Sequence, residues 1–181
     1  MKKLICRTNK SIDDEFVELV MEAKESMYKI ARCRLNNYED VLDVTQNTIL
    51  SAYKNVTQLR NKKHFKTWII KILINECNLF YKKQYKNERV MENVKLSEQK
   101  LDKELEPFTN VVNSSIDFKL LMKVLNDTEQ LVISLFYSNE FSCKEIAKIL
   151  DMNENTVKTN LRRAKDKIKL YYDKRGEYSE K

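Results

Sequence analysis

The sequence predicts an all-α protein made of two small helical domains joined by a flexible linker, the second domain ending in a helix-turn-helix. The first observation behind this prediction is that 181 residues include one glycine, Gly176, and one proline, Pro107. Sheets and tight hairpins use both residue types, so their near absence argues against them. The second observation is that apolar residues recur at helical spacing along most of the chain. The scarcity of glycine also excludes Gly-rich phosphate-binding loops.

Three amphipathic helices are expected in the first domain, over residues 11–35, 39–56 and 65–83. A polar, basic loop over residues 59–64 separates the second helix from the third. Phe65 and Trp68 continue an apolar stripe, so we expect both in the core and not as stacking platforms for bases. The inward positions expected on the second helix are Val41, Val44, Ile49, Ala52 and Tyr53. The third helix is dense in apolar residues, which also include Ile69, Ile72, Leu73, Leu79 and Phe80.

Residues 86–114 lose this periodicity and are rich in Lys, Glu, Gln and Asn, a composition typical of a linker. The linker divides the chain into a first domain over 11–85 and a second over 115–175. In the second domain, helices are expected over 115–125 and 127–138, ahead of the helix-turn-helix.

The helix-turn-helix is expected over residues 141–169. Ser142 and Glu145 have the spacing of a capping box for its first helix, and Asn153 is a good N-cap for its second. The apolar stripe of the second helix consists of Val157, Leu161, Ala164 and Ile168. Its opposite face carries the hydrogen-bond donors that a helix in the major groove needs, on Asn155, Lys158, Thr159, Arg162 and Arg163. An ordinary helical hairpin with a solvated basic face is the alternative interpretation.

The formal net charge is +7, and its distribution suggests a polyanionic partner. Residues 60–89 carry nine Lys or Arg against two acidic residues, and residues 153–175 carry eight against three. Two separated basic patches suit two separated stretches of one nucleic acid, although a solvated helix face can also be basic without such a role.

Four scattered cysteines and one histidine, His64, lack zinc-site spacing, so we expect no metal and no cofactor. The thiols are expected to be reduced and mostly buried. The first residues lack the apolar region of a signal peptide, and the sequence has no apolar run of membrane-spanning length. A cytoplasmic protein without direct membrane insertion is therefore expected.

Two motifs, in a fixed order, carry a resemblance to a known family. The first-domain motif comprises Glu39, Asp40, Asp43, Gln46, Phe65, Thr67, Trp68, Ile69, Lys71 and Asn75. The second-domain motif comprises Glu145, Ile146, Ala147, Thr156, Val157, Lys158, Thr159, Leu161, Arg163 and Ala164. With these residues the chain closely resembles bacterial RNA polymerase sigma-70 factors, and the extracytoplasmic-function (ECF) subfamily in particular. The resemblance covers most of residues 12–83 and 116–172.

The resemblance implies an alternative sigma factor that binds core RNA polymerase and recognises the −35 and −10 elements of promoters, without catalysis of its own. It implies docking of Asp43, Gln46 and Asn47 on the β′ clamp helices. The residues it implies at the −10 element are Arg60, Lys62, Lys63, Lys66, Lys71 and Asn75. Those it implies at the −35 element are Asn155, Lys158, Thr159, Arg162 and Arg163. The implied partners are core polymerase (the β′ clamp and the β flap), promoter DNA and an anti-sigma factor.

Several alternatives remain open from the sequence. Lys165, Lys167 and Lys169 either contact phosphates or are simply solvated. Asn75 can bond locally instead of reading a base, and the docking residues can be an ordinary polar face. Asn155 stands where the family often has glycine, which makes close DNA approach there less certain. A stand-alone helix-turn-helix regulator, with residues 11–83 as a dimerisation or sensor domain, is the main competing function. A small helical enzyme is a third class, but no residues suggest a reaction for it.

Overall fold

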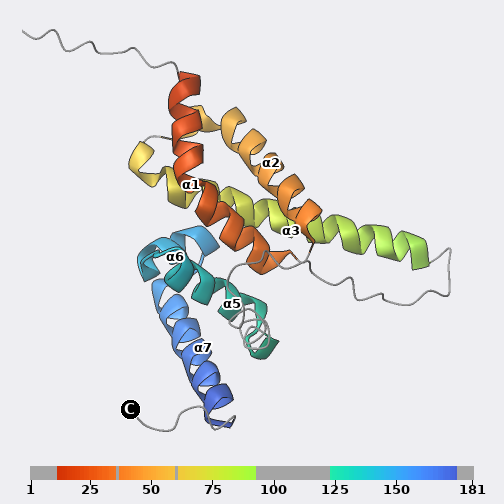
Figure 1. Cartoon of the computed structure of the whole chain (residues 1–181), viewed down its shortest axis with the longest axis vertical. Helices are drawn as coiled ribbons and strands as arrows, with labels where there is room; N and C mark the ends of the chain where they lie inside the picture. Colours follow the sequence, from red (N-terminus) through yellow and green to blue (C-terminus); the bar gives the residue numbers. More distant parts are fainter. Residues whose placement is uncertain (1–11, 36, 60, 93–122, 175–181) are drawn as a thin grey trace, which may run out of the picture.

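The computed structural model describes residues 12–35, 37–59, 61–92 and 123–174. Over this part of the chain the regular structure is entirely helical, as predicted. The first unit contains three long helices, α1 (Ile12–Arg34), α2 (Tyr38–Lys54) and α3 (Phe65–Glu92). Two short 3₁₀ turns, η1 (Val56–Gln58) and η2 (Lys62–His64), connect α2 to α3. The three helices pack on one another, and the C-terminal part of α3 projects beyond the other two (Figure 1).

An apolar core holds the first unit together. Met27, Ile30, Val41, Ile69 and Leu73 have no exposed surface. Burial of side chains of this size stabilises a fold by roughly 1.5–3 kcal/mol each. The rings of Phe16, Phe65 and Trp68 stack edge-on or tilted at the α1–α3 contact, with centroids 5.8–5.9 Å apart. Phe65 is buried and Trp68 is partly buried, which confirms the sequence-based placement of both in the core.

Three details of the first unit differ from the sequence-based prediction. Helix α3 ends at Glu92, nine residues beyond the predicted end at Lys83. The polar residues that suggested a linker after Lys83 are also good helix formers, and a solvated helix needs no apolar stripe. Tyr53 was expected to point inward but is about half exposed, and Leu79, one of the apolar residues that predicted α3, is exposed to the same extent. Tyr53 instead donates a hydrogen bond from its hydroxyl to Asp13 on α1, at 2.9 Å.

The second unit is built from shorter helices. They are α5 (Asp127–Ile133), a π-helical turn η3 (Ser134–Ser138), α6 (Cys143–Leu150) and α7 (Glu154–Lys174). Both α5 and α6 begin with complete capping boxes, made by Asn126 with Glu129 and by Ser142 with Glu145. Asp151 ends α6 in the left-handed region, with φ 51°, a conformation that Asp tolerates better than most residues. The helix expected over 115–125 lies almost wholly outside the described residues, as does the linker from residue 93 to residue 114.

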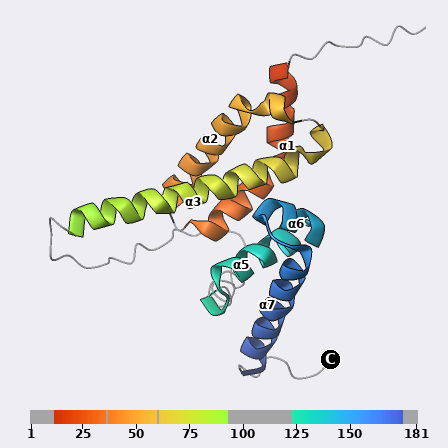
Figure 2. The same cartoon turned by 180° about the vertical axis from the view of Figure 1, so that it is seen from behind.

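The two units pack against each other. Helix α1 contacts α5 and η3, and α3 contacts α6. The α6 end of the second unit faces the first unit, while the C-terminal part of α7 points away from it, as both views show (Figures 1 and 2). An ion pair at this boundary joins Lys71 of α3 to Asp151 at the α6–α7 turn.

Candidate polymerase and nucleic-acid interfaces

The outward face of α2 places the three predicted docking residues together. Asp43, Gln46 and Asn47 are all exposed and lie within about one helical turn. Leu42 and Leu50 are also exposed, by 41% and 56%, and stand four residues on either side of Gln46. Residues four apart share one helix face, so this surface is mixed polar and apolar. The two leucines were not predicted from the sequence, although their spacing from Gln46 was a usable signal.

Acidic groups concentrate at the start of this α2 face. Glu39 and Asp40 lie in the first turn of α2, where the helix dipole favours negative charge. Partial burial, with the neighbouring charges of Asp43 and Glu39, raises the pKa of Asp40 above its ordinary value. The closely spaced carboxylates add to the effect of burial on this pKa, and such an acidic surface is suited to a basic partner.

The predicted −10 residues occupy η2 and the first half of α3. Lys62 and Lys63 lie in η2, whose N-cap Asn61 accepts the Lys63 backbone N–H at 3.0 Å. Lys62 forms an ion pair with Glu15 on α1. Lys71 and Asn75 are four residues apart on α3 and therefore share a face, with Asn75 exposed. Arg60, also predicted for this surface, lies outside the described residues.

Two of these lysines contact the second unit. The Lys66 ammonium donates to the backbone carbonyl of Asn139 at 3.5 Å and lies 5.1 Å from the centre of the Phe141 ring. The Lys71 ammonium lies 2.5 Å from a carboxylate oxygen of Asp151. From the sequence both lysines were assigned to DNA phosphates, and these contacts, which join residues 73 and 80 positions apart, were not anticipated.

The predicted −35 residues lie along α7, opposite its buried stripe of Val157, Leu161 and Ala164. Asn155, Lys158, Arg162 and Arg163 are exposed, and Thr159 is half-buried. The N-cap prediction for Asn153 is confirmed, because its side chain accepts the Asn155 N–H at 2.8 Å. Two residues of this face, Lys158 and Thr159, make polar contacts within α7 itself. Lys158 pairs with Glu154 at 2.7 Å, and the Thr159 hydroxyl donates to the Asn155 carbonyl at 2.8 Å.

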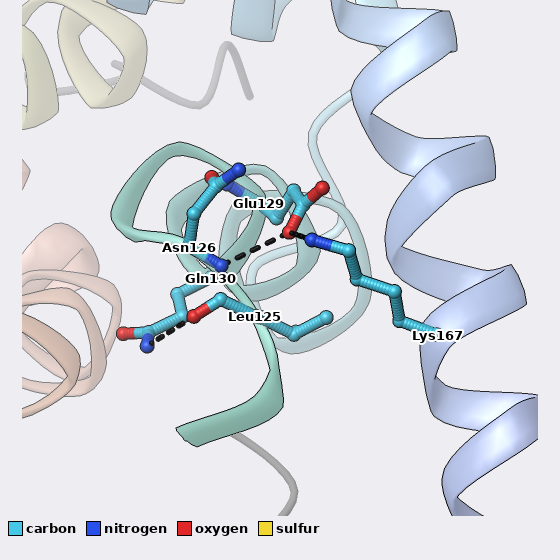
Figure 3. Close-up of polar contacts among 5 residues, drawn as sticks. All are labelled: Leu125, Asn126, Glu129, Gln130 and Lys167. Carbon is cyan, nitrogen blue, oxygen red and sulfur yellow. Dashed lines mark hydrogen bonds and ion pairs between the residues drawn. The ribbon is translucent and has the colours of Figure 1, made fainter.

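An ion pair between the buried Glu129 and the partly exposed Lys167 joins α5 to α7 (Figure 3). Glu129, 2% exposed, accepts hydrogen bonds from the Lys167 ammonium at 2.7 Å and from the Asn126 N–H at 2.9 Å. Burial opposes ionisation of Glu129, but these two bonds outweigh it and lower the pKa of the carboxyl. Lys167 is thus paired with a carboxylate of its own unit while its side chain stays 42% exposed, a contact that neither sequence-based alternative, solvation or phosphate binding, included.

An apolar hollow of about 420 Å³ opens beside this contact, between η3 and α7. Ile133, Tyr137 and Ile168 supply its apolar lining. The Lys165 ammonium lies 5.5 Å from the centre of the Tyr137 ring and 5.8 Å from that of Phe136, which places a positive charge at the rim. The hollow is suited to an apolar segment of another protein.

The described residues contain neither a cluster of metal ligands nor a membrane-spanning helix. Over 12–35, 37–59, 61–92 and 123–174, no three His, Cys, Asp or Glu side chains gather where they could hold a metal ion. No helix in those ranges combines the length and apolar content needed to cross a membrane. Cys33, Cys77 and Cys143 carry free thiols, and burial raises the pKa of Cys77 to about 11.

The fold and surfaces define a two-unit helical DNA-binding protein with a helix-turn-helix in its second unit. Residues 19–86 match the family model for sigma-70 region 2, and residues 116–168 match the model for sigma-70 region 4. The RNA polymerase sigma factor SigV of Bacillus subtilis (strain 168) is 30% identical over 148 residues, which cover 82% of this chain and 85% of SigV. The ECF RNA polymerase sigma factor SigW of the same bacterium is 27% identical over 93% of this chain and 95% of SigW.

The chain therefore belongs to the sigma-70 family, as an ECF sigma factor that directs transcription initiation. Sigma factors are non-enzymatic initiation factors, which bind core RNA polymerase and promoter DNA. The sequence-based prediction of family and function is thus confirmed, and the stand-alone regulator is the less supported interpretation.

Two solved structures share the fold. The sigma factor RpoE of Bartonella quintana, in complex with the anti-sigma factor NepR, superposes with a TM-score of 0.66 at 19% identity, covering 85% of this chain and 94% of RpoE. CnrH, in complex with the cytosolic domain of CnrY, gives a TM-score of 0.63 at 19% identity over 89% of each chain. At this identity the likeness establishes the fold, with two helical domains.

Proposed function

We propose that Asp43, Gln46 and Asn47 on α2 form the polymerase-docking surface of this sigma factor, together with Leu42 and Leu50. The observation that carries this assignment is the exposure of both leucines beside the three polar residues. Exposed leucines flanking carboxylates suit a basic partner helix that also presents apolar side chains, because apolar burial adds affinity and charge adds orientation. The β′ clamp helices are the partner that the family resemblance implies.

The −10 element is read by the first unit. Lys62, Lys63, Lys66 and Lys71, with Arg60, neutralise the phosphates of the opened strand, and Asn75 contacts a flipped base. An asparagine amide offers a donor and an acceptor side by side, which suits a base edge. The exposure of Asn75 on the same α3 face as Lys71 supports this role.

The −35 element is read by α7. Asn155, Lys158, Thr159, Arg162 and Arg163 lie opposite the buried stripe, so α7 can enter a major groove while its other side stays packed on α5 and α6. Arg163 is the residue we assign to bidentate contact with a guanine. Lys158 and Arg162 contribute contacts to the backbone phosphates.

The hollow between η3 and α7 is the site we assign to the β flap, because Ile133, Tyr137 and Ile168 give it an apolar lining. An anti-sigma factor is a further partner, by likeness to RpoE, whose solved structure contains one. The protein works in the cytoplasm, where core polymerase is found, and contributes no catalytic group of its own.

Base selectivity at the −10 element tests the residue assignments. We would compare the chain with its Asn75→Ala variant, each bound to core polymerase, on promoter variants carrying every base at each −10 position. The expected result is a loss of preference at one position with little change at the others. Full retention of selectivity would show that Asn75 reads no base. If the unchanged chain binds no promoter DNA, either alone or in complex with core polymerase, the proposed DNA-binding residues and the proposed function are both contradicted.

A further inference from the structure

Two polar contacts join the N-terminal end of α1 to the connection between α2 and α3. Glu15 forms an ion pair with Lys62 in η2. Asp13 accepts a hydrogen bond from the hydroxyl of Tyr53, near the end of α2, at 2.9 Å. Both acidic residues lie in the first turn of α1, and the connection, drawn in yellow, lies beside that part of α1 in both views (Figures 1 and 2).

An aromatic cluster adds a third contact next to these two. The buried ring of Phe16 lies edge-on to the ring of Tyr53, with 5.3 Å between centroids, and to the ring of Phe65, with 5.9 Å. Tyr53 lies in the last turn of α2, and Phe65 is the first residue of α3. Helix α1 therefore holds the connection where it leaves α2, in η2 and where it enters α3.

The η2 turn is short and exposed. It is a three-residue 3₁₀ turn in which no residue is buried. Two hydrogen bonds close it, from the Lys63 N–H to the Asn61 side chain and from the His64 N–H to the Asn61 carbonyl, each at 3.0 Å. A single exposed turn of this kind opens easily, so its conformation depends on the elements packed beside it.

The ion pair leaves Lys62 available to DNA. The Lys62 side chain is 62% exposed, and that of Glu15 is 36% exposed. An ammonium group has three N–H donors, so Lys62 can hold the Glu15 carboxylate with one donor and a phosphate with another. By charge alone, however, a carboxylate at this place repels DNA. Repulsion and orientation give opposite expectations for the role of Glu15, and a substitution can separate them.

We propose that Glu15 is a positioning residue for recognition of the −10 element, which holds η2 so that Lys62 and Lys63 meet the opened strand in a preset arrangement. Asp13 and Phe16 support the same arrangement from neighbouring positions of α1. The inference rests on the proposed function of the two lysines and adds the group that orients them. Holding the turn before DNA arrives lowers the conformational entropy lost on binding, which raises affinity without a further contact to DNA.

Binding of single-stranded DNA by the polymerase complex tests this role. The probe is a labelled oligonucleotide with the non-template −10 strand of a promoter found by run-off transcription. Fluorescence anisotropy measures its affinity for the chain bound to core polymerase. Glu15→Gln keeps the size of the side chain but removes its charge, and it is expected to weaken binding about two- to fivefold, the range of one exposed ion pair. Equal or tighter binding by Glu15→Gln, the result that repulsion predicts, would overturn the proposal.

Glu22→Gln is the matched control for the lost charge. Glu22 is exposed and lies about two turns further along α1. Affinity of this variant for the oligonucleotide should equal or slightly exceed that of the unchanged chain. Both variants should keep the affinity for core polymerase and the thermal midpoint of the unchanged chain. A loss of oligonucleotide binding in Glu22→Gln as large as that in Glu15→Gln would overturn the specific role of Glu15.

A double-mutant cycle shows whether Glu15 acts through Lys62. Lys62→Gln should weaken oligonucleotide binding because a phosphate contact is lost, and Glu15→Gln should then cause no further loss. A further loss of the same size in the Lys62→Gln background would overturn the positioning role. A loss in Lys62→Gln with none in Glu15→Gln would overturn this inference alone. Unchanged binding in both single variants would refute the proposed DNA contact of Lys62, and this inference with it.

Amide hydrogen exchange in the free chain gives a measurement that needs no DNA. Loss of the ion pair should loosen η2, so the N–H groups of Lys63 and His64 should exchange about two- to fivefold faster in Glu15→Gln than in the unchanged chain. The same groups should exchange at the unchanged rate in Glu22→Gln. Unchanged exchange in Glu15→Gln would overturn the proposal even if its DNA binding had weakened.

Discussion

The two units position their functional helices by different means. The first unit uses long helices of 17 to 28 residues whose apolar faces meet in one core, and the docking surface we propose for it is the solvent side of α2. The second unit uses α5 and α6, of seven and eight residues, which are too short to be stable alone. Polar contacts offset the low stability of these short helices. They are two complete capping boxes and the ion pair between the buried Glu129 and the partly exposed Lys167.

Because of this difference, we expect surface substitutions in the first unit to change function without changing stability, and substitutions of the polar contacts in the second unit to change both. Surface changes on α2 touch the partner and leave the core alone. Changes to the polar ties behind α7 alter the fold and the angle of the recognition helix together. Substitutions in both units test this contrast, from the largest expected effect to the smallest.

The largest effect is expected from Asp43→Lys. Reversing this charge places like charges together at the docking surface, which costs several kcal/mol, so affinity for core polymerase should fall at least about 100-fold. The thermal midpoint should stay within a few degrees, because Asp43 is exposed. Fluorescence titration with labelled core polymerase measures the first quantity and circular dichroism the second.

Glu22→Lys is the matched control for this change. It makes the same charge reversal at an exposed position on α1, outside the docking surface. Its polymerase affinity should remain within about twofold of the unchanged chain, since distant exposed charges are screened. Equal losses in both variants would mean that net charge, and not the α2 face, governs binding.

Lys167→Met should destabilise the second unit by about 2–3 kcal/mol. The variant keeps the apolar stem but leaves the Glu129 carboxylate buried with the Asn126 N–H as its remaining donor. Urea unfolding monitored by circular dichroism measures the change. Lys169→Met, an exposed change in the same helix, should shift stability by less than about 0.5 kcal/mol.

Acid titration provides a second readout for the same pair. The pKa of Glu129 is lowered in the folded chain, so its stabilising contribution is present above the unfolded value near 4.5 and is lost as the pH falls through the folded value. The stability gap between the unchanged chain and Glu129→Gln should therefore close in acid. A gap that stays constant through this range would show that ionisation of Glu129 does not stabilise the unit.

Arg163→Ala should act on DNA reading with little effect on folding. The expected cost is about 1–3 kcal/mol in promoter binding, with relaxed discrimination at one −35 position. Lys158→Ala is the comparison, since loss of a phosphate contact weakens all sequences about equally. Binding to a set of −35 variants in complex with core polymerase distinguishes the two patterns. An unchanged profile for Arg163→Ala would remove this residue from base reading.

The smallest difference is expected between two N-caps. Ser142→Ala removes the hydroxyl that accepts the Glu145 N–H in the capping box and donates to the Glu145 carboxylate, and should cost about 1–2 kcal/mol. Asn37→Ala removes one cap bond of 3.2 Å from a helix held by the first core and should cost about 0.5 kcal/mol. Equal costs, measured by thermal unfolding, would contradict the claim that the second unit depends more on polar ties.

The sequence predicted the features that depend on local periodicity and capping. The buried stripe of α7, the Ser142–Glu145 box and the Asn153 cap were readable because all their partners lie within a few residues. The end of α3 was placed too early because a helical segment made of polar residues has the composition of a linker. The arrangement of the docking residues on one exposed face of α2 also follows from spacing, although their role remains a prediction.

Long-range polar contacts could not be predicted. Lys167 meets Glu129 across 38 residues, and Lys71 meets Asp151 across 80. Nothing in a lysine's neighbours along the chain indicates whether it will face solvent, DNA or a buried carboxylate. Lys66, Lys71 and Lys167 were all assigned to DNA or solvent, and the fold gives each of them a protein partner. Tyr53 has an apolar ring and a polar tip, which explains why periodicity placed it inward.

Run-off transcription is the most direct test of the sigma function and of the docking surface on α2. The purified chain, and in parallel Asp43→Lys, is added to sigma-free core polymerase with fragmented genomic DNA of the source organism, and the 5′ ends of the transcripts are sequenced. With the unchanged chain, we predict discrete new start sites that have −35 and −10 elements in common. With Asp43→Lys, we predict no new start sites. No transcripts with the unchanged chain, combined with tight binding of discrete DNA fragments in the absence of polymerase, would contradict this prediction and favour a stand-alone regulator.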